Sequence, residues 1–563
     1  MEIQGRRILV LGGFGMVGTA VCREILDRDP AHLIVTSLRK EEAEEAVDGF
    51  QSAYPEASLE AAWGNIFVRE DFKDLGRGEL LKKPENRRVF LNDVFGDLDE
   101  ETLSGQELYR LIERTRPDII VDCINTATAL AYQNVYASSR EVVNTLESGE
   151  DAAIEDATFR LVATQYTPQL VRHVQVLYGA MRDHGTGMYM KVGTTGTGGM
   201  GLNIPYTHSE ERPSRVLLSK TAMAGAHSML LFLMGRTPDG PIVKEVKPAS
   251  AIAWKRIGRG PIKRAGRPIP LYDVRLDSAE VPREELPLRV PEDDFQRLGE
   301  DRVLESVYID TGENGLFSAG EFAVITSIGQ MEFITPEEIA ASVIREIQGG
   351  NTGYDIVAAL DSAIMGPTYR AGAMREAALA RLRGLEEQHG IRSIAFEVLG
   401  PPRLSKLLFE AELLRRTAGT LRAVTEADPA ALAAKCRSLV EEDRELRSQM
   451  VSVGIPILLP DGRLLRGPQI KIPPERGRVS EPVDPERIDQ WADGGWVDLR
   501  EEGMRAWIRR AQSILAEVEA QPEEDTSSRY HHDRSYWKLD EPLDIGQTVA
   551  WIFIREDEGE RMK

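Results

Sequence analysis

Apolar and polar positions follow two periods along the first half of the chain. The run ILVLGG at 8–13 is apolar, and Val17, Val21 and Ile25 then repeat at the period of an α-helix. Similar runs recur in HLIVTSL, RPDIIVDCIN and GMYMKVGTT, and helical stretches precede the last two. Apolar strands that alternate with helices are typical of a parallel sheet covered on both faces. We therefore predict an α/β fold with a doubly wound parallel sheet.

The pattern changes from about residue 361 onward. Ala, Leu, Arg and Glu recur there at helical period, as in MREAALARLRGLEEQHG and LSKLLFEAELLRRTAGTLRAV. The stretch VGIPILLPDGRLLRGP predicts a β-hairpin that turns at Asp461 and Gly462. A polar linker, EAQPEEDTSSRYHHDRS, precedes TVAWIFIRE, which we expect to form a last strand. We predict a mostly helical C-terminal region over 361–563.

Length and charge limit the possible functions. The chain has 563 residues, which is too long for one ordinary core and predicts two or three domains. Hydrophobic residues make up 42% and charged residues 28%, as in soluble globular proteins. The formal net charge of −22 disfavours nucleic acid and anionic membranes as partners. We expect a small-molecule substrate instead.

Cysteine usage and the N-terminal sequence predict a cytoplasmic protein. Cys22, Cys123 and Cys436 are far apart and show no CxxC spacing, which argues against a disulfide framework and a zinc site. The cluster at 530–533, Tyr-His-His-Asp, lies in the polar linker without a third ligand motif, so we predict no metal. A folded-domain motif follows the first residue within a dozen positions, and no apolar run reaches the ~20 residues of a membrane helix.

A glycine-rich turn carries the first chemical signal. Gly12, Gly13, Gly15 and Gly18 lie between the first strand and the first helix. Glycine there permits a tight turn and the close approach of a pyrophosphate to backbone N–H groups. The bare spacing is a weak motif, but its strand–turn–helix setting favours a dinucleotide site over a chance glycine-rich turn.

The end of the second strand predicts the type of nucleotide. A carboxylate at this place selects the free 2′-hydroxyl of NAD. The chain has Ser37, Arg39 and Lys40 here instead, which suit the 2′-phosphate of NADP through charge-assisted bonds. The alternative is that the two cations only begin a solvated helix, RKEEAEEA. We predict NADP as the cofactor, with NAD less favoured.

These stretches together resemble the short-chain dehydrogenase/reductase superfamily in its extended, epimerase-like branch. The resemblance rests on LVLGGFGMVG, WGNI, RPDIIVDCINTA, GTTGTGGMGLNIPYTHSE and MEFITPEEIAASVIREIQGGNTGYDI, and it covers about 1–360. It implies an NADP-binding Rossmann domain at 1–240 and a substrate lobe with a closing segment at 241–360. The region 361–563 is an extension outside the resemblance.

The resemblance also assigns individual residues. Asn65 stands at the position of the family's adenine-binding aspartate, Thr195 replaces its substrate-binding serine, and Lys220 matches the lysine that holds the nicotinamide ribose. The expected cofactor-binding residues are Gly12, Phe14, Gly15, Met16, Val17, Gly18, Ser37, Arg39, Lys40, Asn65, Ile66, Ile124, Asn125 and Lys220.

One departure from the family concerns the catalytic acid. The family keeps a tyrosine one helical turn before its lysine, and this chain has Val216 there. A valine has no proton to give. Tyr206 and His208, between Thr195 and Lys220, are the nearest titratable candidates, although a structural role for both is the alternative. We include Thr195, Lys220, Tyr206 and His208 as candidate catalytic residues.

Two further features concern substrate and assembly. The cluster KRIGRGPIKRAGRP at 255–268 concentrates positive charge and suits an anionic substrate or the 2′-phosphate, the alternative being a solvated loop. Small residues after Lys220, among them Ala222, Ala224 and Gly225, allow close helix packing. In the resembling family this helix often joins a dimer interface, so we expect a homodimer.

Three functions compete on this evidence. The leading hypothesis is an NADP-dependent oxidoreductase that acts on a carbonyl or alcohol through an atypical active site. The second is an epimerase or dehydratase that retains its nucleotide and recycles the hydride. The third is a catalytically silent NADP-binding scaffold or sensor, which the absence of a tyrosine at 216 favours and the presence of Thr195 and Lys220 opposes.

Overall fold

The computed structural model describes most of the chain in two compact units. The described residues are 1–131, 133, 135–148, 151–193, 215–238, 240–248, 250–264, 266–282, 284–299, 301–312, 315–327, 333–350, 362–365, 368–397, 402–472, 479–522 and 534–556. Unit 1 comprises Met1–Gly199, Pro213–Ala253 and Glu332–Ala373. Unit 2 comprises Met200–Arg212, Trp254–Met331 and Met374–Lys563.

Unit 1 is built on a seven-stranded sheet in the order β15-β6-β5-β4-β1-β2-β3, and its pairings are parallel. Its strands are β1 (Arg7–Leu11), β2 (His32–Ser37), β3 (Leu59–Trp63), β4 (Ile119–Asp122), β5 (Met188–Val192), β6 (Ile242–Pro248) and β15 (Ser362–Met365). A short parallel pair, β7 (Ser250–Ala251) with β14 (Phe333–Ile334), lies outside this sheet. The strand order reverses between β1 and β4, which confirms the predicted doubly wound α/β fold.

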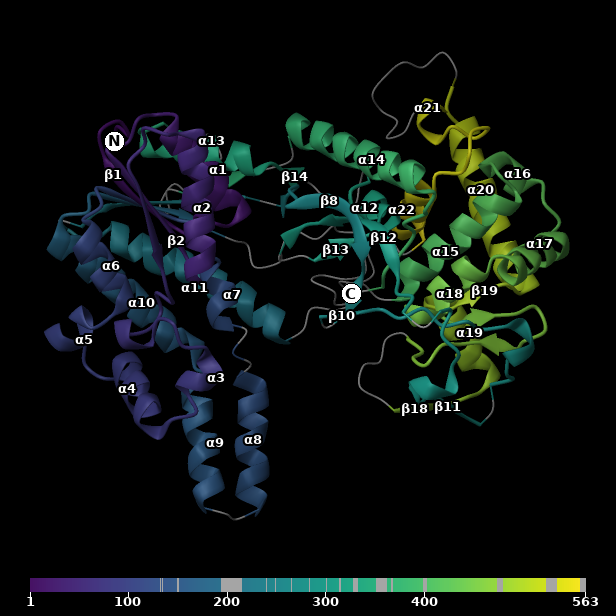
Figure 1. The fold of residues 1–563 in the computed structure, drawn as a ribbon, viewed down its shortest axis with the longest axis horizontal. Helices are drawn as coiled ribbons and strands as arrows, with labels where there is room; N and C mark the ends of the chain where they lie inside the picture. The colour runs from purple at the N-terminus through teal and green to yellow at the C-terminus, as the bar shows by residue number, and fades with distance from the viewer. Residues whose placement is uncertain are drawn as a thin grey trace. The chain divides into compact units, whose positions relative to one another are not determined.

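Helices cover both faces of this sheet (Figure 1). The longer helices are α1 (Met16–Leu26), α2 (Lys40–Ala53), α4 (Pro84–Phe95), α6 (Glu107–Thr115), α8 (Val135–Ser148), α9 (Asp151–Ala163), α10 (Tyr166–His184), α11 (Arg215–Gly235) and α13 (Pro336–Ile347). The shorter ones are η1 (Glu70–Phe72), α3 (Arg77–Leu80), α5 (Glu100–Ser104) and α7 (Thr126–Ala131). Helices α8 and α9 pack side by side as a hairpin.

The alternation of side chains along the strands explains the two helical layers. Ile8 and Val10 of β1 pack into one core with α1, α2 and α13. Leu9 and Leu11 of the same strand pack into the opposite core with α6, α10 and α11. Successive side chains of a strand point to opposite faces, so a wholly apolar run needs cover on both sides. The carboxyl ends of the strands therefore remain as the edge where a ligand site can form.

Unit 2 is mostly helical, with small sheets. Its helices are η2 (Leu276–Ser278), η3 (Glu292–Asp294), α12 (Ala319–Ile325), α14 (Tyr369–His389, of which the first residues belong to unit 1), α15 (Pro402–Thr417), α16 (Leu421–Thr425), α17 (Pro429–Glu442), α18 (Arg444–Ser452), α19 (Pro485–Gly494), α20 (Glu501–Glu519), α21 (Arg534–Trp537) and α22 (Ile545–Arg555). Its strands are β8 (Arg256–Pro261), β9 (Lys263–Arg264), β10 (Arg267–Pro268), β11 (Glu285–Pro287), β12 (Glu305–Asp310), β13 (Leu316–Phe317), β16 (Ile457–Leu458), β17 (Leu464–Leu465), β18 (Ser480–Pro482) and β19 (Val497–Asp498). Strand β11 pairs with β18, so residues before and after the α14–α15 region share one fold. None of the helices in the described parts of both units is long and apolar enough to span a bilayer.

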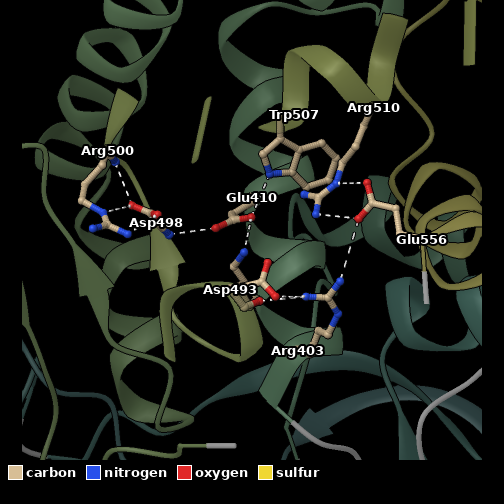
Figure 2. A network of polar contacts seen from close by, with 9 residues as sticks. Arg403, Glu410, Asp493, Asp498, Arg500, Trp507, Arg510 and Glu556 are labelled. Atoms are coloured by element: carbon tan, nitrogen blue, oxygen red, sulfur yellow. Dashed lines mark hydrogen bonds and ion pairs between the residues drawn. The ribbon is translucent and has the colours of Figure 1, made fainter. Parts of the chain in front are cut away.

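A buried carboxylate ties three elements of unit 2 together (Figure 2). Glu410 of α15 accepts hydrogen bonds from the backbone N–H of Asp498 at 2.7 Å and from the indole N–H of Trp507 at 2.8 Å. Burial raises the pKa of Glu410 above its ordinary value. Nearby, the Arg510 guanidinium holds Glu556 with two bonds of 2.8 Å. These contacts join α15, β19, α20 and the end of α22 by specific polar geometry as well as apolar packing.

Two C-terminal predictions have different outcomes. The hairpin is confirmed, because β16 and β17 pair antiparallel and Gly462 has the positive φ of +80° that the turn needs. The predicted strand TVAWIFIRE is wrong, because these residues lie in helix α22. Asp544 caps this helix by accepting a hydrogen bond from the backbone N–H of Gln547, and most of the helix is buried against α12 and α15. Tertiary packing and a capping residue here override the strand preference of β-branched and aromatic side chains.

Candidate functional site at the carboxyl edge of the sheet

The glycine turn between β1 and α1 has the geometry that the sequence predicts. Gly12 has φ +76°, a conformation that favours glycine. A Cβ atom at Gly18 would lie 2.1 Å from the carbonyl oxygen of Gly12, and one at Gly13 would lie 2.6 Å from the Cγ1 atom of Val35. The glycines therefore let α1 approach the strands more closely than any side chain would allow.

The N-terminus of α1 is suited to an anion. Gly15 is its N-cap residue, no side chain caps the helix, and its first turn contains no acidic residue. The first N–H groups of an α-helix have no intrahelical acceptor, and the helix dipole adds a partial positive charge. A pyrophosphate fits this cradle chemically because small residues leave its backbone donors accessible.

The end of β2 holds both signs of charge. The hydroxyl of Ser37 donates a hydrogen bond to the Glu42 carboxylate at 2.6 Å. Arg39 is the exposed N-cap residue of α2. Lys40 lies 3.6 Å from Glu44 and 5.2 Å from the centre of the Trp63 ring. Helix α2 thus brings a carboxylate to the place where the strand sequence shows only a hydroxyl and cations.

The ends of β3 and β4 position four further predicted residues. The Asn65 side chain accepts a hydrogen bond from the backbone N–H of Phe67 at 3.0 Å, and Ile66 is buried. A Cβ atom on Gly12 would meet the Cγ1 atom of Ile124 at 3.2 Å, so β4 ends against the glycine turn. Asn125 follows directly and begins α7 by accepting the Ala129 N–H through its carbonyl. The structure thus brings the predicted residues of β1 and β4 together.

A buried ion pair lies beside them. Asp122 of β4 and Lys191 of β5 face each other in strand register, and their charged atoms are 2.9 Å apart. The Lys191 ammonium also donates to the carbonyl of Ile124 at 2.6 Å and to the Thr126 hydroxyl at 3.3 Å. The Tyr189 phenol donates to Asp122 at 2.6 Å. This network fixes the loop after β4.

The same network sets the protonation of its members. Burial alone would raise the pKa of Asp122, but Lys191 and the bonds from Tyr189, Lys191 and the backbone of Ile124 hold it below its ordinary value. Burial and the adjacent carboxylate raise the pKa of Tyr189 well above its ordinary value. Asp122 therefore stays ionised, and Tyr189 keeps its proton on that carboxylate. The sequence motifs do not include this pair, although opposite charges within the last two residues of two apolar strands, IIVD and MYMKV, are a usable signal.

Two histidines extend the polar group into the helical layer. His173 of α10 and His227 of α11 have ring centres 6.3 Å apart, and the centre of the Phe67 ring lies 4.7 Å from that of His173. Within the described residues, both ring nitrogens of His173 lack a hydrogen-bond partner. The same holds for the Nε2 atom of His227. Burial lowers the pKa of His173 to about 4 and that of His227 well below its ordinary value. Both imidazoles are therefore neutral near pH 7.

A small pocket adjoins His173. Asp93, Gln106, Gln169 and Arg172 provide its polar wall. Apolar side chains of the β3–α4 region and α10 complete the lining, namely Ile66, Phe67, Val68, Phe90, Val94 and Val176. The Nε and one terminal nitrogen of Arg172 have no hydrogen-bond partner in the described residues. Polar pockets of this kind are typical sites for ordered water.

Of the four candidate catalytic residues, the described part of the structure includes Lys220. Lys220 is buried on α11, with 3% of its surface exposed. Thr195, Tyr206 and His208 lie outside the described residues, as does the cluster at 530–533. In the described ranges, no group of three or more His, Cys, Asp or Glu side chains is placed to hold a metal ion. The cluster at 255–268 forms strands β8 to β10 of unit 2, where Arg259 pairs with Glu305 at 2.6 Å.

Fold and site together define a protein with a Rossmann-type domain and a second, mostly helical unit. Residues 271–557 match the family model described as the beta-methylindole-3-pyruvate reductase C-terminal domain. This range is just over half of the chain, and the chain belongs to that family. No curated protein sequence is significantly similar to this chain.

Several solved structures show a remote likeness. A short-chain dehydrogenase from Burkholderia cenocepacia J2315 in complex with NADP is 12% identical, and the match covers 69% of this chain and 98% of that chain with a TM-score of 0.27. The MalC reductase/Diels-Alderase from Malbranchea aurantiaca is 14% identical over 44% of this chain and 74% of its own, with a TM-score of 0.25. UDP-glucose 4-epimerase from Thermotoga maritima is 14% identical, and the match covers 44% of this chain and 57% of that chain with a TM-score of 0.23. With identities and scores this low, the likenesses have no bearing on activity.

Proposed function

We propose that this protein is an NADP-dependent oxidoreductase of the extended short-chain type, which reduces a carbonyl group or oxidises the corresponding alcohol. The observation that carries the proposal is the glycine turn, where Gly12 has a positive φ, Gly13 and Gly18 leave no room for side chains, and α1 begins without a side-chain cap. A reduced nicotinamide nucleotide, when bound, supplies the hydride. The residues of this chain bind the nucleotide, orient the carbonyl and provide a proton.

We assign the nucleotide contacts to residues along the carboxyl edge of the sheet. The turn from Gly12 to Gly18, with Phe14, Met16 and Val17, receives the pyrophosphate. Asn65 and Ile66 flank the adenine, Ile124 and Asn125 line the middle of the cofactor, and Lys220 binds the nicotinamide ribose. The Asp122–Lys191 pair supports this arrangement, since it fixes the loop that carries Ile124 and Asn125.

We further propose a 2-oxo acid with an aromatic side chain as the substrate class. The family of this chain takes its name from a reductase of beta-methylindole-3-pyruvate, which is an indole-bearing 2-oxo acid. An anionic substrate also suits the basic segment at 255–268. Because the family is defined by residues 271–557, we assign substrate choice to unit 2.

The first prediction concerns the nucleotide. Arg39→Ala should weaken NADP binding by about tenfold and leave NAD binding nearly unchanged, because we assign its exposed guanidinium to the 2′-phosphate. Glu42→Gln is the counterpart, since its carboxylate beside Ser37 repels a phosphate, and it should strengthen NADP binding. Calorimetric titration of both variants with NADP and NAD measures these effects. Equal affinity of the parent for both nucleotides, unaltered by Arg39→Ala, would contradict the preference.

A catalytically silent nucleotide-binding scaffold is the second candidate, because Val216 replaces the acid that the resembling family uses. Oxidation of NADPH by beta-methylindole-3-pyruvate separates the two candidates. Nucleotide binding without turnover, for this and related aromatic 2-oxo acids, would favour the scaffold. An epimerase or dehydratase would instead retain its nucleotide through purification and return it to its starting oxidation state.

A further inference from the structure

Helix α11 lacks a proton donor at the position where one is expected. Residue 216 is a valine, and it lies one helical turn before the buried Lys220. Carbonyl reduction needs a proton on the oxygen as well as a hydride on the carbon, and a positioned general acid is typically worth ~10²–10⁴ in rate. Any acid that replaces the missing phenol must reach this same turn of α11.

Two phenols from other helices meet this turn. The Tyr166 hydroxyl, at the start of α10, donates to the Ser219 Oγ atom at 3.4 Å. The Tyr136 hydroxyl, at the start of α8, lies 3.4 Å from the same oxygen. Both bonds are long for hydroxyl pairs, so neither phenol is held tightly to Ser219. Catalytic hydrogen bonds are often loose before substrate binds.

The direction of the Ser219 side chain places both phenols beside position 216. Side chains on a helix point toward its N-terminus and cover the preceding turn. The Ser219 hydroxyl follows this rule and donates to the carbonyl of Arg215 at 2.9 Å. Its oxygen therefore lies over the turn formed by residues 215 and 216. The guanidinium of Arg215 lies 5.6 Å from the centre of the Tyr136 ring at the same turn.

The rest of the fold puts this turn at the carboxyl edge of the sheet. Helix α10 ends before β5 begins, so its first residue, Tyr166, lies at the opposite edge, where β4 ends. The Tyr166 side chain packs against a hydrophobic cluster to which α7 contributes Ala127 and Leu130 and α11 contributes Met223 and Ala224. Helix α7 in turn begins at Thr126, whose hydroxyl accepts a bond from Lys191. Tyr166 is thus anchored to the network that fixes the proposed nucleotide site.

Tyr189, although nearest to the charge pair, does not qualify as the acid. Its side chain is completely buried, and its hydroxyl donates a short hydrogen bond of 2.6 Å to the Asp122 carboxylate. Tyr166, in contrast, is partly exposed and bonded only loosely among the described contacts.

We propose that Tyr166 is the general acid that replaces the missing phenol at position 216, an inference that rests on the proposed reductase function. As the carbonyl carbon gains the hydride, the π electron pair of the C=O bond moves to oxygen. That oxygen takes the proton from the Tyr166 hydroxyl, whose O–H bond breaks and leaves its electron pair on the phenolate. The Ser219 hydroxyl then turns from the Arg215 carbonyl and gives its proton to the phenolate as it takes one from Tyr136, so that no serine alkoxide forms. Water reprotonates Tyr136 and leaves hydroxide.

Single-turnover oxidation of NADPH by beta-methylindole-3-pyruvate tests the proposal in the full-length protein. Tyr166→Phe should lower the rate of this step by about 10²–10⁴, while NADPH affinity and KM stay within about twofold. Tyr136→Phe should leave the first turnover nearly unchanged, because it acts only in reprotonation.

Tyr178→Phe is the matched control, since Tyr178 lies toward the other end of α10 and its ring contacts Arg182. It should react like the parent. A Tyr166→Phe protein that reacts within about threefold of the parent would overturn the proposal, and loss of the step in Tyr206→Phe alone would assign the acid to Tyr206. A parent that binds NADPH but oxidises none with any aromatic 2-oxo acid would overturn both this proposal and the reductase function. An active parent with an unaffected Tyr166→Phe variant overturns this proposal alone.

Discussion

His173 and His227 are buried bases kept neutral by the fold. Burial lowers the pKa of both, and that of His173 falls to about 4. An unfolded chain has no such burial, so its histidines titrate near ~6.5. As the pH falls, these two histidines therefore bind protons in the unfolded state before they do so in the folded state. The stabilisation from the neutral imidazole is complete above the unfolded pKa and is lost between about 6.5 and 4.

The residue-scale prediction follows from this loss of stability at acidic pH. The free energy of unfolding should fall by roughly 3 kcal/mol on account of His173 alone between pH 6.5 and 4. His173→Gln should remove this part of the acid sensitivity, so that its melting temperature depends less on pH than that of the parent. His389→Gln, at the exposed end of α14, is the control and should keep the parent's dependence. Identical pH dependence of parent and His173→Gln, measured by scanning calorimetry, would contradict the prediction.

Helix α11 has two faces with different roles. Lys220 and His227 are buried, whereas Leu218, Met229 and Leu233 are 57%, 51% and 58% exposed. The last three repeat at helical spacing and form one apolar stripe. An exposed apolar stripe on a long helix is typical of a surface that a partner covers. We propose that it forms the homodimer interface that the small residues of this helix suggested.

The element-scale prediction tests this stripe. Leu233→Glu should convert a dimer into a monomer, because an unpaired carboxylate at a buried interface opposes association. We expect the dissociation constant to rise by at least about tenfold, measured by light scattering across a concentration series. Val143→Glu on α8, a similarly exposed apolar position, is the matched control and should leave the dimer intact. A parent that is monomeric at all concentrations would contradict the interface.

Two compact units give the whole molecule two sources of stability. Each has its own hydrophobic clusters, as in the two faces of the sheet in unit 1 and the tryptophan-rich cluster around Trp491 and Trp496 in unit 2. A ligand that binds only the native form of one unit stabilises that unit by mass action. The proposed nucleotide residues all belong to unit 1.

The molecule-scale prediction is that NADP raises the unfolding temperature of unit 1 and leaves that of unit 2 unchanged. Calorimetry should resolve two transitions, and NADP at about 100 times its dissociation constant should stabilise one of them by about 2.7 kcal/mol. The other transition should stay in place, because unit 2 has no part in the assigned nucleotide contacts. One transition that moves as a whole would show that the two units unfold as a single cooperative body.

The sequence by itself determined the parts of this protein that depend on local physics. The apolar runs predicted β1, β2, β4 and β5, because a strand covered on both faces must be apolar along its length. The glycine turn was equally readable, since Gly12 needs a positive φ that other residues avoid. The hairpin at Gly462 was predictable for the same reason.

Only the tertiary structure decided which distant residues meet. Asp122 faces Lys191 because β4 and β5 pair in one particular register, and register depends on packing across the whole sheet. Tyr166 and Tyr136 reach Ser219 from helices that lie far from it in sequence. Helix α22 forms where local preference indicates a strand, because its buried contacts with α12 and α15 outweigh that preference. Local patterns specify elements, whereas the chemistry of the site arises from long-range contacts that no single stretch of sequence encodes.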